Sequence, residues 1–428
     1  MTTQISRQEP VIETIATSHN KMAAQMTVPD GQRADLRATA ITRLVLTEFR
    51  SYASLRLQVD TAPVILTGAN GAGKTNLLEA LSFLSPGRGL RQAKLSDVTR
   101  THGDAAEGNT WAVAATLNSA SGPLDVGTGL EALPTAAPDD GEPGSVATPR
   151  RVVRIDGAPA RSANALADVA VVSWLTPQMD RLFIDGASAR RRFLDRLVYG
   201  FDTGHARRVA AYEKALRERS RLLRDRRGDD AWLDALEETI AGHGIAVAAA
   251  RRDAVSRLSG SMESGFAGDD NAFPRARVAV SGAVEDWLAD CPAVEAESRF
   301  RVALLNSRTL DATTGGAQTG PHKSDFLVTH IAKNMPASQC STGEQKALLI
   351  AVVLADARLQ AARLGRAPLL LLDEVAAHLD DIRREALYRE IQSIGAQAWL
   401  TGTDPGLFHG MSGVAQFMTV EDGAVTLT

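Results

Sequence analysis

Apolar and polar residues alternate over residues 41–59, ITRLVLTEFRSYASLRLQV, with the period of two that is typical of β-strands. This pattern predicts two strands joined by a turn at Arg50–Ser51. A short apolar run at 64–67 predicts a third strand, and apolar residues recur at helical spacing between Asn76 and Leu84. The patterned part of the chain therefore begins with a hairpin, a buried strand and a helix.

Strand patterns recur further along the chain, separated by one long helical region. The sequences WAVAATL, RRVVRIDG and DVAVVSWL predict strands, and the run LLLL at 369–372 predicts a strand covered on both faces. From 177 to 303 the apolar spacing is helical, over a stretch too long to be a connection. We therefore expect an α/β fold that has a mixed sheet with flanking helices and an inserted helical lid subdomain.

Shifts in composition divide the chain into parts. The first residues are polar and without periodicity, which predicts a disordered extension. Gly, Ala, Pro and Asp dominate 118–149, which predicts a loop insertion. Strand and loop character is expected to return near Phe300. The expected parts are the extension (1–38), the first part of the head (39–176), the helical lid (177–303) and the second part of the head (304–428).

The segment between the strand at 64–67 and its helix reads GANGAGKT, which is the spacing of a phosphate-binding loop. Its glycines permit positive φ angles, and the N–H groups of a helix N-terminus attract an anion. Lys74 is suited to reach the β- and γ-phosphates of ATP, and the Thr75 hydroxyl is suited to ligate Mg²⁺. The expected nucleotide-binding residues are Gly68, Ala69, Asn70, Gly71, Ala72, Gly73, Lys74 and Thr75.

Two acids, Asp373 and Glu374, follow the apolar run at 369–372. The carboxyl end of a strand is where open α/β sheets keep their ligands. Asp373 is suited to hold Mg²⁺ together with Thr75, because a hard cation prefers carboxylate oxygen. Glu374 is suited to accept a proton from the water that attacks the γ-phosphate, which favours hydrolysis over nucleotide sensing. The alternative is a pair of exposed acids at a strand end.

The segment STGEQK, 341–346, has the pattern of a capped helix start. Ser341 is followed three residues later by Glu344, as in a capping box. An ordinary helix N-terminus explains this pattern, but a helix that begins with small residues and glycine is also an anion site. Because the segment lies between the phosphate loop and the paired acids in sequence, we expect it to act on the nucleotide. The residues concerned are Ser341, Thr342, Gly343, Glu344 and Gln345.

Composition limits the class of protein. The 428 residues carry a formal charge of −4, so any binding of nucleic acid must be local. The two cysteines, Cys291 and Cys340, lack the spacing of a zinc site or a disulfide framework. No apolar run reaches the roughly 18 residues of a membrane span. We expect a soluble, cytoplasmic protein without a membrane segment.

A local basic excess lies between Arg181 and Arg227, which contains 14 Lys or Arg against 6 Asp or Glu. Leu and Phe at helical spacing within it predict amphipathic helices with cationic outer faces. Such a face would bind DNA phosphates without reading bases, and a solvated surface is the alternative. The DNA-binding candidates are Arg190, Arg191, Arg192, Arg217, Arg221 and Arg224.

The motifs GANGAGKT, STGEQK and LLLLDEVAAHLD, in this order, resemble the phosphate loop, signature and metal-acid strand of the ABC-type ATPase superfamily. The segments LTEFRSYASLRL, TNLLEALSFLSPGRGLR, LTPQMDRLFIDGASARRRFLDRLV, TGPHKSD and TGTD add a specific resemblance to the RecF family. The resemblance runs from about residue 41 to the C-terminus. It implies an ABC-type ATPase head of the kind found in the SMC and Rad50 proteins.

The resemblance also implies an ATP-driven homodimer, in which Ser341 of one copy closes on the γ-phosphate held by Lys74 of the other. Asp380 would lie at the dimer seam, Arg50 near the nucleotide, and Gln178 in the Gln-loop. Family members usually have an acid at the position of Gln178, and TGTD supplies Thr403 and Asp404 where transporters have a switch histidine.

The implied function is ATP-dependent binding of duplex, gapped and single-strand-junction DNA in recombinational repair and replication-fork maintenance. RecR- and RecO-like mediators would be partners in loading recombinase, and slow, DNA-stimulated ATP hydrolysis with Mg²⁺ would reset the dimer. A chromosome-organising head would need long coiled-coil heptads, which are absent from the sequence. A transporter ATPase lacks DNA stimulation, and a small-molecule kinase lacks the signature segment and ATP-dependent dimerisation.

Overall fold

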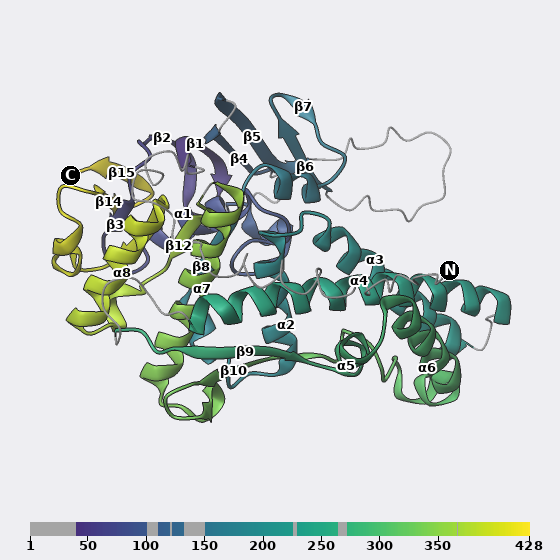
Figure 1. Ribbon diagram of the computed structural model, residues 1–428. Coiled ribbons are helices and arrows are strands. Elements are labelled where there is room, and N and C mark those ends of the chain that lie inside the picture. The colour runs from purple at the N-terminus through teal and green to yellow at the C-terminus, as the bar shows by residue number, and fades with distance from the viewer. Residues whose placement is uncertain are drawn as a thin grey trace, which may run out of the picture. The chain divides into compact units, whose positions relative to one another are not determined.

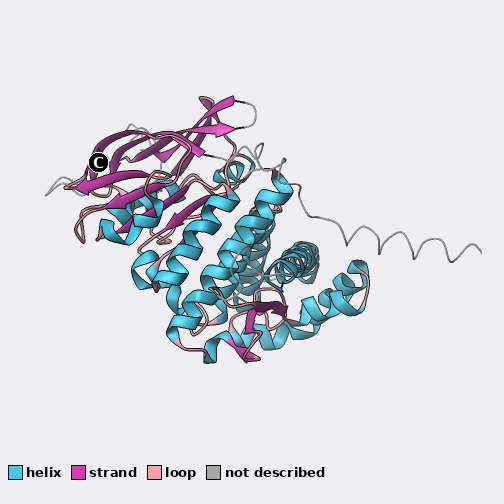
Figure 2. Ribbon diagram, turned by 60° about the vertical axis from the view of Figure 1, so that its left-hand side comes forward, coloured by secondary structure: helices cyan, strands magenta, loops and turns pink. Residues whose placement is uncertain are grey.

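The computed structural model describes residues 40–100, 110–119, 122–131, 150–225, 229–263, 272–365 and 367–428. Strands in these residues form two six-stranded sheets and a three-stranded sheet, and the helices between β8 (Val172–Leu175) and β10 (Asp325–His330) form a lobe that shares a hydrophobic core with α7 (Thr342–Leu364) of the head (Figure 1). Figure 2 shows the strands of the head and the helices of the lobe as distinct regions. The expected extension at 1–38 lies outside the described residues.

The first sheet is antiparallel and contains the predicted hairpin. Its order is β2-β1-β4-β5-β6-β7, and Phe49 and Tyr52 face each other across the turn at Arg50–Ser51. Alternate residues such as Leu44 and Leu46 are fully buried, which is the reason for the alternating pattern in the sequence. The strands are β1 (Ala40–Phe49), β2 (Tyr52–Gln58), β4 (Ala112–Ser119), β5 (Gly122–Glu131), β6 (Arg150–Ile155) and β7 (Ala158–Pro159).

The prediction of a loop insertion at 118–149 is wrong for the first part of this range. Ser119 pairs with Gly122, and β5 then runs back along the whole of β4 and continues along β6. The glycines and acids of β5 gave no strand signal, because its pairing with two neighbouring strands, and not its own propensity, stabilises it. Residues 132–149 lie outside the described part of the chain.

The second sheet has the order β15-β14-β3-β13-β12-β8 and is parallel except for the β14–β15 pair. Every residue of β3, β8 and β12 is buried, as expected for a sheet covered on both faces. The strands are β3 (Val64–Thr67), β8 (Val172–Leu175), β12 (Leu369–Leu372), β13 (Ala398–Gly402), β14 (Gln416–Glu421) and β15 (Ala424–Leu427). The helices of this part are α1 (Lys74–Ser82), α7 (Thr342–Leu364) and α8 (Asp381–Ile394).

The helical lobe is larger than predicted and contains strands. The boundary expected at 303/304 falls inside a continuous helix, and β9 lies within the segment expected to be helical, where it pairs with β10 (Figure 1). The helices are α2 (Ala187–Tyr199), α3 (His205–Asp225), α4 (Asp230–Glu263), α5 (Ala283–Asp290) and α6 (Ala293–Thr314). The small sheet has the order β11-β10-β9, from β9 (Ala276–Ser281), β10 (Asp325–His330) and β11 (Met335–Pro336).

Short 3-10 helices connect these elements. They are η2 (Leu95–Val98), η3 (Ala163–Asp168), η4 (Pro177–Arg181), η5 (Ala337–Gln339), η6 (Ala376–His378) and η7 (Pro405–Met411). No helix in the described residues is long and apolar enough to cross a membrane.

Buried ion pairs hold the lobe together. Arg219 of α3 is fully buried, and its guanidinium donates to Glu237 (2.8 Å) and Asp311 (2.7 Å). The Asp311 contact explains why α6 extends past the expected boundary, because the end of this helix completes the ion-pair network. Arg251 donates to both oxygens of Asp195 at 2.8 Å. Burial raises the pKa of Asp195, but Arg251 and a histidine outweigh it and lower the value to about 2.

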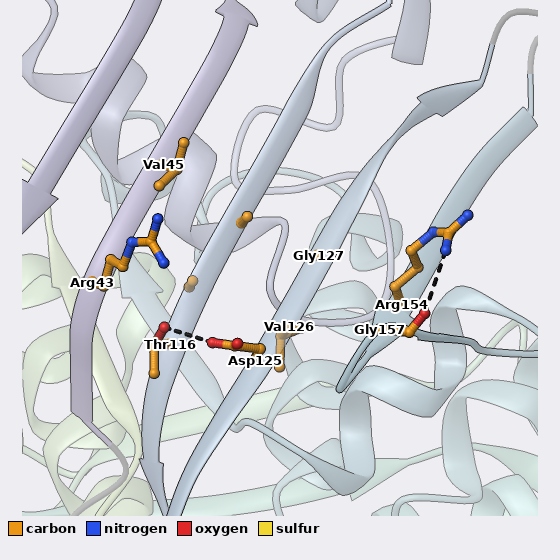
Figure 3. A pocket seen from close by; sticks show the side chains of 10 residues that line it. Arg43, Val45, Thr116, Asp125, Val126, Gly127, Arg154 and Gly157 are labelled. Carbon is orange, nitrogen blue, oxygen red and sulfur yellow. Dashed lines mark hydrogen bonds between the residues drawn. The ribbon is translucent and has the colours of Figure 1, made fainter.

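A groove of about 370 Å³ lies on the outer face of the first sheet (Figure 3). Arg43, Arg154 and the hydrogen-bonded pair of Thr116 and Asp125 (2.6 Å) line it, and small residues form its floor. It contains none of the residues that the sequence predicts to bind nucleotide. The candidate chemistry lies instead at the carboxyl ends of the strands in the second sheet.

Candidate nucleotide site

The phosphate loop joins β3 to α1, which confirms the local structure predicted for GANGAGKT. Lys74 is buried in the first turn of α1, and its Nζ donates to the carbonyl oxygens of Gly68 (2.7 Å) and Ala69 (2.9 Å). Gly68 has a φ of 148°, and a Cβ there would lie 2.2 Å from the carbonyl oxygen of Val420. Gly73 caps α1 without a side-chain hydrogen bond, so the first N–H groups of the helix are available to an anion.

Thr75 and Asp373 meet although they are far apart in the sequence. The Thr75 hydroxyl lies 3.0 Å from Asp373 Oδ1 and 3.1 Å from Oδ2. The Asp373 backbone N–H donates to Leu175 O at 2.9 Å, which ties this residue to the neighbouring strand β8. A hydroxyl and a carboxylate in contact form a donor set that fits Mg²⁺, so these two residues would hold it. Burial raises the pKa of Asp373, and a bound cation would oppose this effect.

Glu374 adopts a left-handed backbone with a φ of 54°, which is uncommon for a residue other than glycine. Its N–H donates to Thr401 Oγ1 at 2.9 Å, and the same hydroxyl donates to Asp373 Oδ1 at 2.8 Å. Thr401 therefore fixes the carboxylate of Asp373 and the backbone of Glu374. Burial lowers the pKa of Lys74, and the charges of Glu374 and Asp373 raise it, so the ammonium and the two carboxylates belong to one site.

The signature segment begins α7 as the predicted capping box. Ser341 N donates to Glu344 Oε2 at 3.1 Å, and the Ser341 hydroxyl accepts from Glu344 N at 3.4 Å. Lys333 also donates to Glu344, and this hydrogen bond, together with those from Ser341, lowers the pKa of the carboxyl to about 2. Ser341, Thr342 and Gly343 are exposed. The start of this helix therefore presents small polar residues to solvent.

Gln345 does not belong to that exposed surface, although the sequence groups it with the signature residues expected to act on the nucleotide. Its side chain is buried and donates to Cys340 O at 2.8 Å, because the fourth position of the helix turns back toward the core. The next residue, Lys346, donates to Asp180 Oδ2 at 3.2 Å. This contact joins α7 to η4, the turn that carries the exposed residue Gln178 directly after β8.

Arg50 lies beside the phosphate helix. Its guanidinium donates to both oxygens of the buried Glu79 in α1, at 3.0 and 2.9 Å, and to the Asp97 carbonyl. Arg91, which sequence analysis did not select, donates to Glu79 and to Asn76 of α1, each at 2.7 Å. The positive charge of Arg91 also opposes the rise in the pKa of Asp373 that burial causes. An arginine soon after the phosphate helix, in PGRGLR, was the available sequence signal.

The remaining head residues take local roles. Asp380 is exposed at the N-terminus of α8, and its side chain accepts from Arg383 N at 2.9 Å. Of the two residues proposed at the switch position, Asp404 caps η7 by accepting from Gly406 N at 2.8 Å. In the TGTD segment, Thr401 makes the contacts to the paired acids. Sequence analysis missed it, although it stands at the carboxyl end of the buried strand β13.

The basic segment is only partly a surface. Arg190 donates to both oxygens of Asp325 (2.7 and 2.9 Å), and Arg191 donates to Ser324 O at 2.7 Å. The prediction that these two belong to an outer cationic face is wrong, because α2 packs against β10 at this point. The four exposed candidates are Arg192, Arg217, Arg221 and Arg224.

The mixed sheet carries a phosphate loop, a hydroxyl–carboxylate pair, a second acid and a capped signature helix. Together these features define an ABC-type ATPase head. Residues 40–426 match the family described as RecF/RecN/SMC N terminal domain. The chain is 47% identical over 387 residues to the DNA replication and repair protein RecF of Mesorhizobium japonicum, covering 90% of this chain and 97% of the relative. The Brucella suis RecF is 48% identical over 388 residues, covering 90% and 96%. The chain therefore belongs to the RecF family within this group.

Solved structures agree with the fold. The recombination mediator protein RecF, as RecF-ATPrS in the RecFOR pathway, gives a TM-score of 0.76 at 21% identity, over 91% of this chain and 98% of that chain. The corresponding RecF-ATP structure gives 0.75 at 22% identity, over 92% and 98%. At this level of identity the likeness concerns the fold alone.

Proposed function

We propose that the protein is an ATP-dependent DNA-binding protein of recombinational repair and replication-fork maintenance. Two copies would join around ATP and Mg²⁺, bind duplex or gapped DNA, and help RecR- and RecO-like mediators load recombinase onto single-stranded gaps. Slow, DNA-stimulated hydrolysis would then release the dimer. The names of the curated relatives, and the RecFOR pathway to which the RecF structures belong, support this assignment.

One observation supports the proposed ATP-dependent dimer. Lys74, Thr75, Asp373 and Glu374 are already assembled in one chain, whereas the Ser341 side chain bonds only within its own capping box in the described residues. The exposed small residues at the start of α7 leave room for a phosphate, and a Cβ on Gly343 would meet nothing within 4 Å. We infer that the signature helix serves the nucleotide of a second copy.

Within this site each side chain has a separate task. Lys74 would exchange its two carbonyl contacts for phosphate oxygens, and Thr75 with Asp373 would hold Mg²⁺, which neutralises charge on the phosphates. Glu374 would accept the proton of the attacking water. Ser341 of the partner copy would donate its hydroxyl to the γ-phosphate, so that ATP joins the two heads.

The substitution Ser341→Arg tests this shared site. We expect ATP binding by the monomer to be unchanged and ATP-dependent dimerisation to be lost, because a bulky cation replaces a hydroxyl at the inferred contact with the partner's nucleotide. Loss of the cap would also cost about 1 kcal/mol of stability. Sedimentation velocity with saturating ATP measures the dimer, and binding of a fluorescent ATP analogue measures the monomer site.

Ser338→Arg is the matched control, since Ser338 is exposed three residues earlier and is outside the cap. It should dimerise like the unmodified protein. An unmodified protein that stays monomeric in saturating ATP would refute the shared site, whatever the variants do.

The arginines of α3 test the DNA assignment. Replacing Arg217, Arg221 and Arg224 together by Gln should weaken binding of duplex DNA and flatten its salt dependence. Each lost phosphate contact lowers the slope of log K against log [salt] by about 0.9, so the expected change is roughly 2.7. Fluorescence anisotropy over a range of KCl concentrations measures the slope. An unchanged slope would make these arginines ordinary solvated surface, and DNA that fails to stimulate hydrolysis would favour the transporter class.

A further inference from the structure

A cleft of about 700 Å³ lies between the loop that follows α1 and the helices α2 and α3. Arg88 lines it from the loop, Arg192 from α2, and Gln178 from η4. Its volume lies within the roughly 300–1,000 Å³ typical of ligand sites. No residue of the phosphate loop lines this cleft, so it is separate from the phosphate cradle.

The free charges in this cleft are positive. Its three acids are each close to an arginine: Asp185 lies 3.7 Å from Arg181, Glu213 lies 3.6 Å from Arg217, and the buried Asp195 is bound by Arg251.

Arg88 and Arg192, by contrast, are exposed and have no carboxylate partner within the described residues. A third arginine, Arg196, stacks on Trp174 with its guanidinium carbon 4.2 Å from the ring centroid. Its Nε is buried and has no hydrogen-bond partner in the part of the chain that the structure describes. The other Arg196 contacts are internal, since its Nη2 donates to Trp174 O at 3.1 Å, so Arg88 and Arg192 are the two cationic side chains available to an anionic ligand.

The cleft continues along α3. Ala206, Ala210 and Glu213 line it, and they are spaced four and three residues apart, so they share one face of the helix. Continuing the same spacing reaches Arg217, which is paired with Glu213, and then the exposed residues Arg221 and Arg224. One stripe of α3 therefore leads from the cleft to the basic end of the helix.

We propose that a single nucleic-acid strand, held by its phosphates, follows this stripe of α3 into the cleft and contacts Arg88 and Arg192. The inference deepens the proposed DNA binding and rests on it. Phosphates are the expected contacts because Trp174 and Phe193 are only 5% and 3% exposed, which leaves little ring surface for bases to stack on.

The same geometry couples the strand to hydrolysis. Gln178 lines the cleft directly after β8, the strand whose Leu175 carbonyl accepts from the Asp373 N–H. The Asp180–Lys346 contact joins the same turn to the signature helix. A strand in the cleft would therefore restrain η4, which connects both halves of the ATPase site. Single-stranded DNA should stimulate ATP hydrolysis through this route.

The test compares the full-length Arg88→Gln/Arg192→Gln variant with Arg301→Gln, which removes an exposed arginine of α6 outside the stripe. Anisotropy with a 30-nucleotide single strand, measured over a range of KCl concentrations, should give a slope of log K against log [salt] that is lower by about 1.4 for the double variant. This is about 0.7 for each phosphate contact on a single strand. ATP-dependent dimerisation should stay intact, and stimulation of hydrolysis by the single strand should fall several-fold.

Each other outcome is decisive. Equal slopes for the double variant, Arg301→Gln and the unmodified protein would overturn the strand path and leave the ATP dimer standing. If the double variant lost affinity for a free nucleotide but kept its affinity for the single strand, the cleft would be a small-molecule site. This result would also overturn the proposed strand path. A failure of the proposed function looks different, because the unmodified protein would then bind no DNA at all.

Discussion

Lys74→Ala is expected to reduce ATP binding more than any other single substitution in this protein. The ammonium donates two hydrogen bonds to backbone carbonyls, at 2.7 and 2.9 Å, and would transfer them to phosphate oxygens. Hydrogen bonds to charged groups contribute about 1.5–3 kcal/mol each. Two of them, at 1.4 kcal/mol for each factor of ten, correspond to a loss of roughly 100-fold or more in affinity. Isothermal titration calorimetry with ATP and Mg²⁺ measures this loss.

Lys94→Ala is the control, since Lys94 is an exposed lysine that precedes η2 and lies outside the phosphate loop. Its affinity for ATP should match that of the unmodified protein. A thermal unfolding curve for Lys74→Ala separates lost binding from a relaxed loop. Near-normal affinity in a folded Lys74→Ala protein would show that the loop is not a phosphate cradle.

Glu374→Gln should separate ATP binding from ATP hydrolysis. Glutamine keeps the size of the side chain but cannot accept the proton of the attacking water, and removing a general base lowers rates by about 10²- to 10⁴-fold. The left-handed backbone at this position is held by the N–H contact to Thr401, which the substitution leaves in place. We expect ATP affinity to be retained and an ATP-bound dimer to accumulate.

Phosphate release measures the rate of hydrolysis, and sedimentation with and without ATP measures the dimer. Glu238→Gln, at an exposed position of α4, is the matched control and should hydrolyse ATP normally. A Glu374→Gln protein that hydrolyses ATP at the normal rate would remove Glu374 from the role of base. If it stayed monomeric in saturating ATP, the shared site would be refuted.

The elements that could be predicted from the sequence are those whose signals are local. The hairpin at β1 and β2, the phosphate loop and the buried strand β12 each follow from a short periodicity or motif. The predictions that were wrong concern elements that are stabilised by residues far away in the sequence. The strand β5 contains three glycines and is held by its pairing to β4 and β6. The end of α6 is rich in Thr and Ser, and the Arg219–Asp311 ion pair stabilises it.

The same distinction applies to the site. Motif spacing placed Thr75 in the first turn of α1 and the pair Asp373 and Glu374 just after β12, because the strand and helix patterns that flank these motifs are local. The bridging role of Thr401 was not visible, since only the pairing of β13 with β12 brings its hydroxyl to the acids. Arg190 looked like a surface cation because its partner, Asp325, lies far along the chain.

The position of β3 between β13 and β14 has a consequence for synthesis of the protein in the cell. The strand β3, which leads into the phosphate loop, pairs with β13 and β14. The hydroxyl of Thr67 in β3 donates to the carbonyl of Met418 in β14, which is 351 residues later in the chain. At translation rates of about 5–20 residues per second, the ribosome takes roughly 20–70 s to supply those neighbours. Until then β3 has two open edges. The strand that carries the phosphate loop therefore lacks both neighbours for most of translation, and the complete nucleotide site can form only after β13 and β14 have emerged.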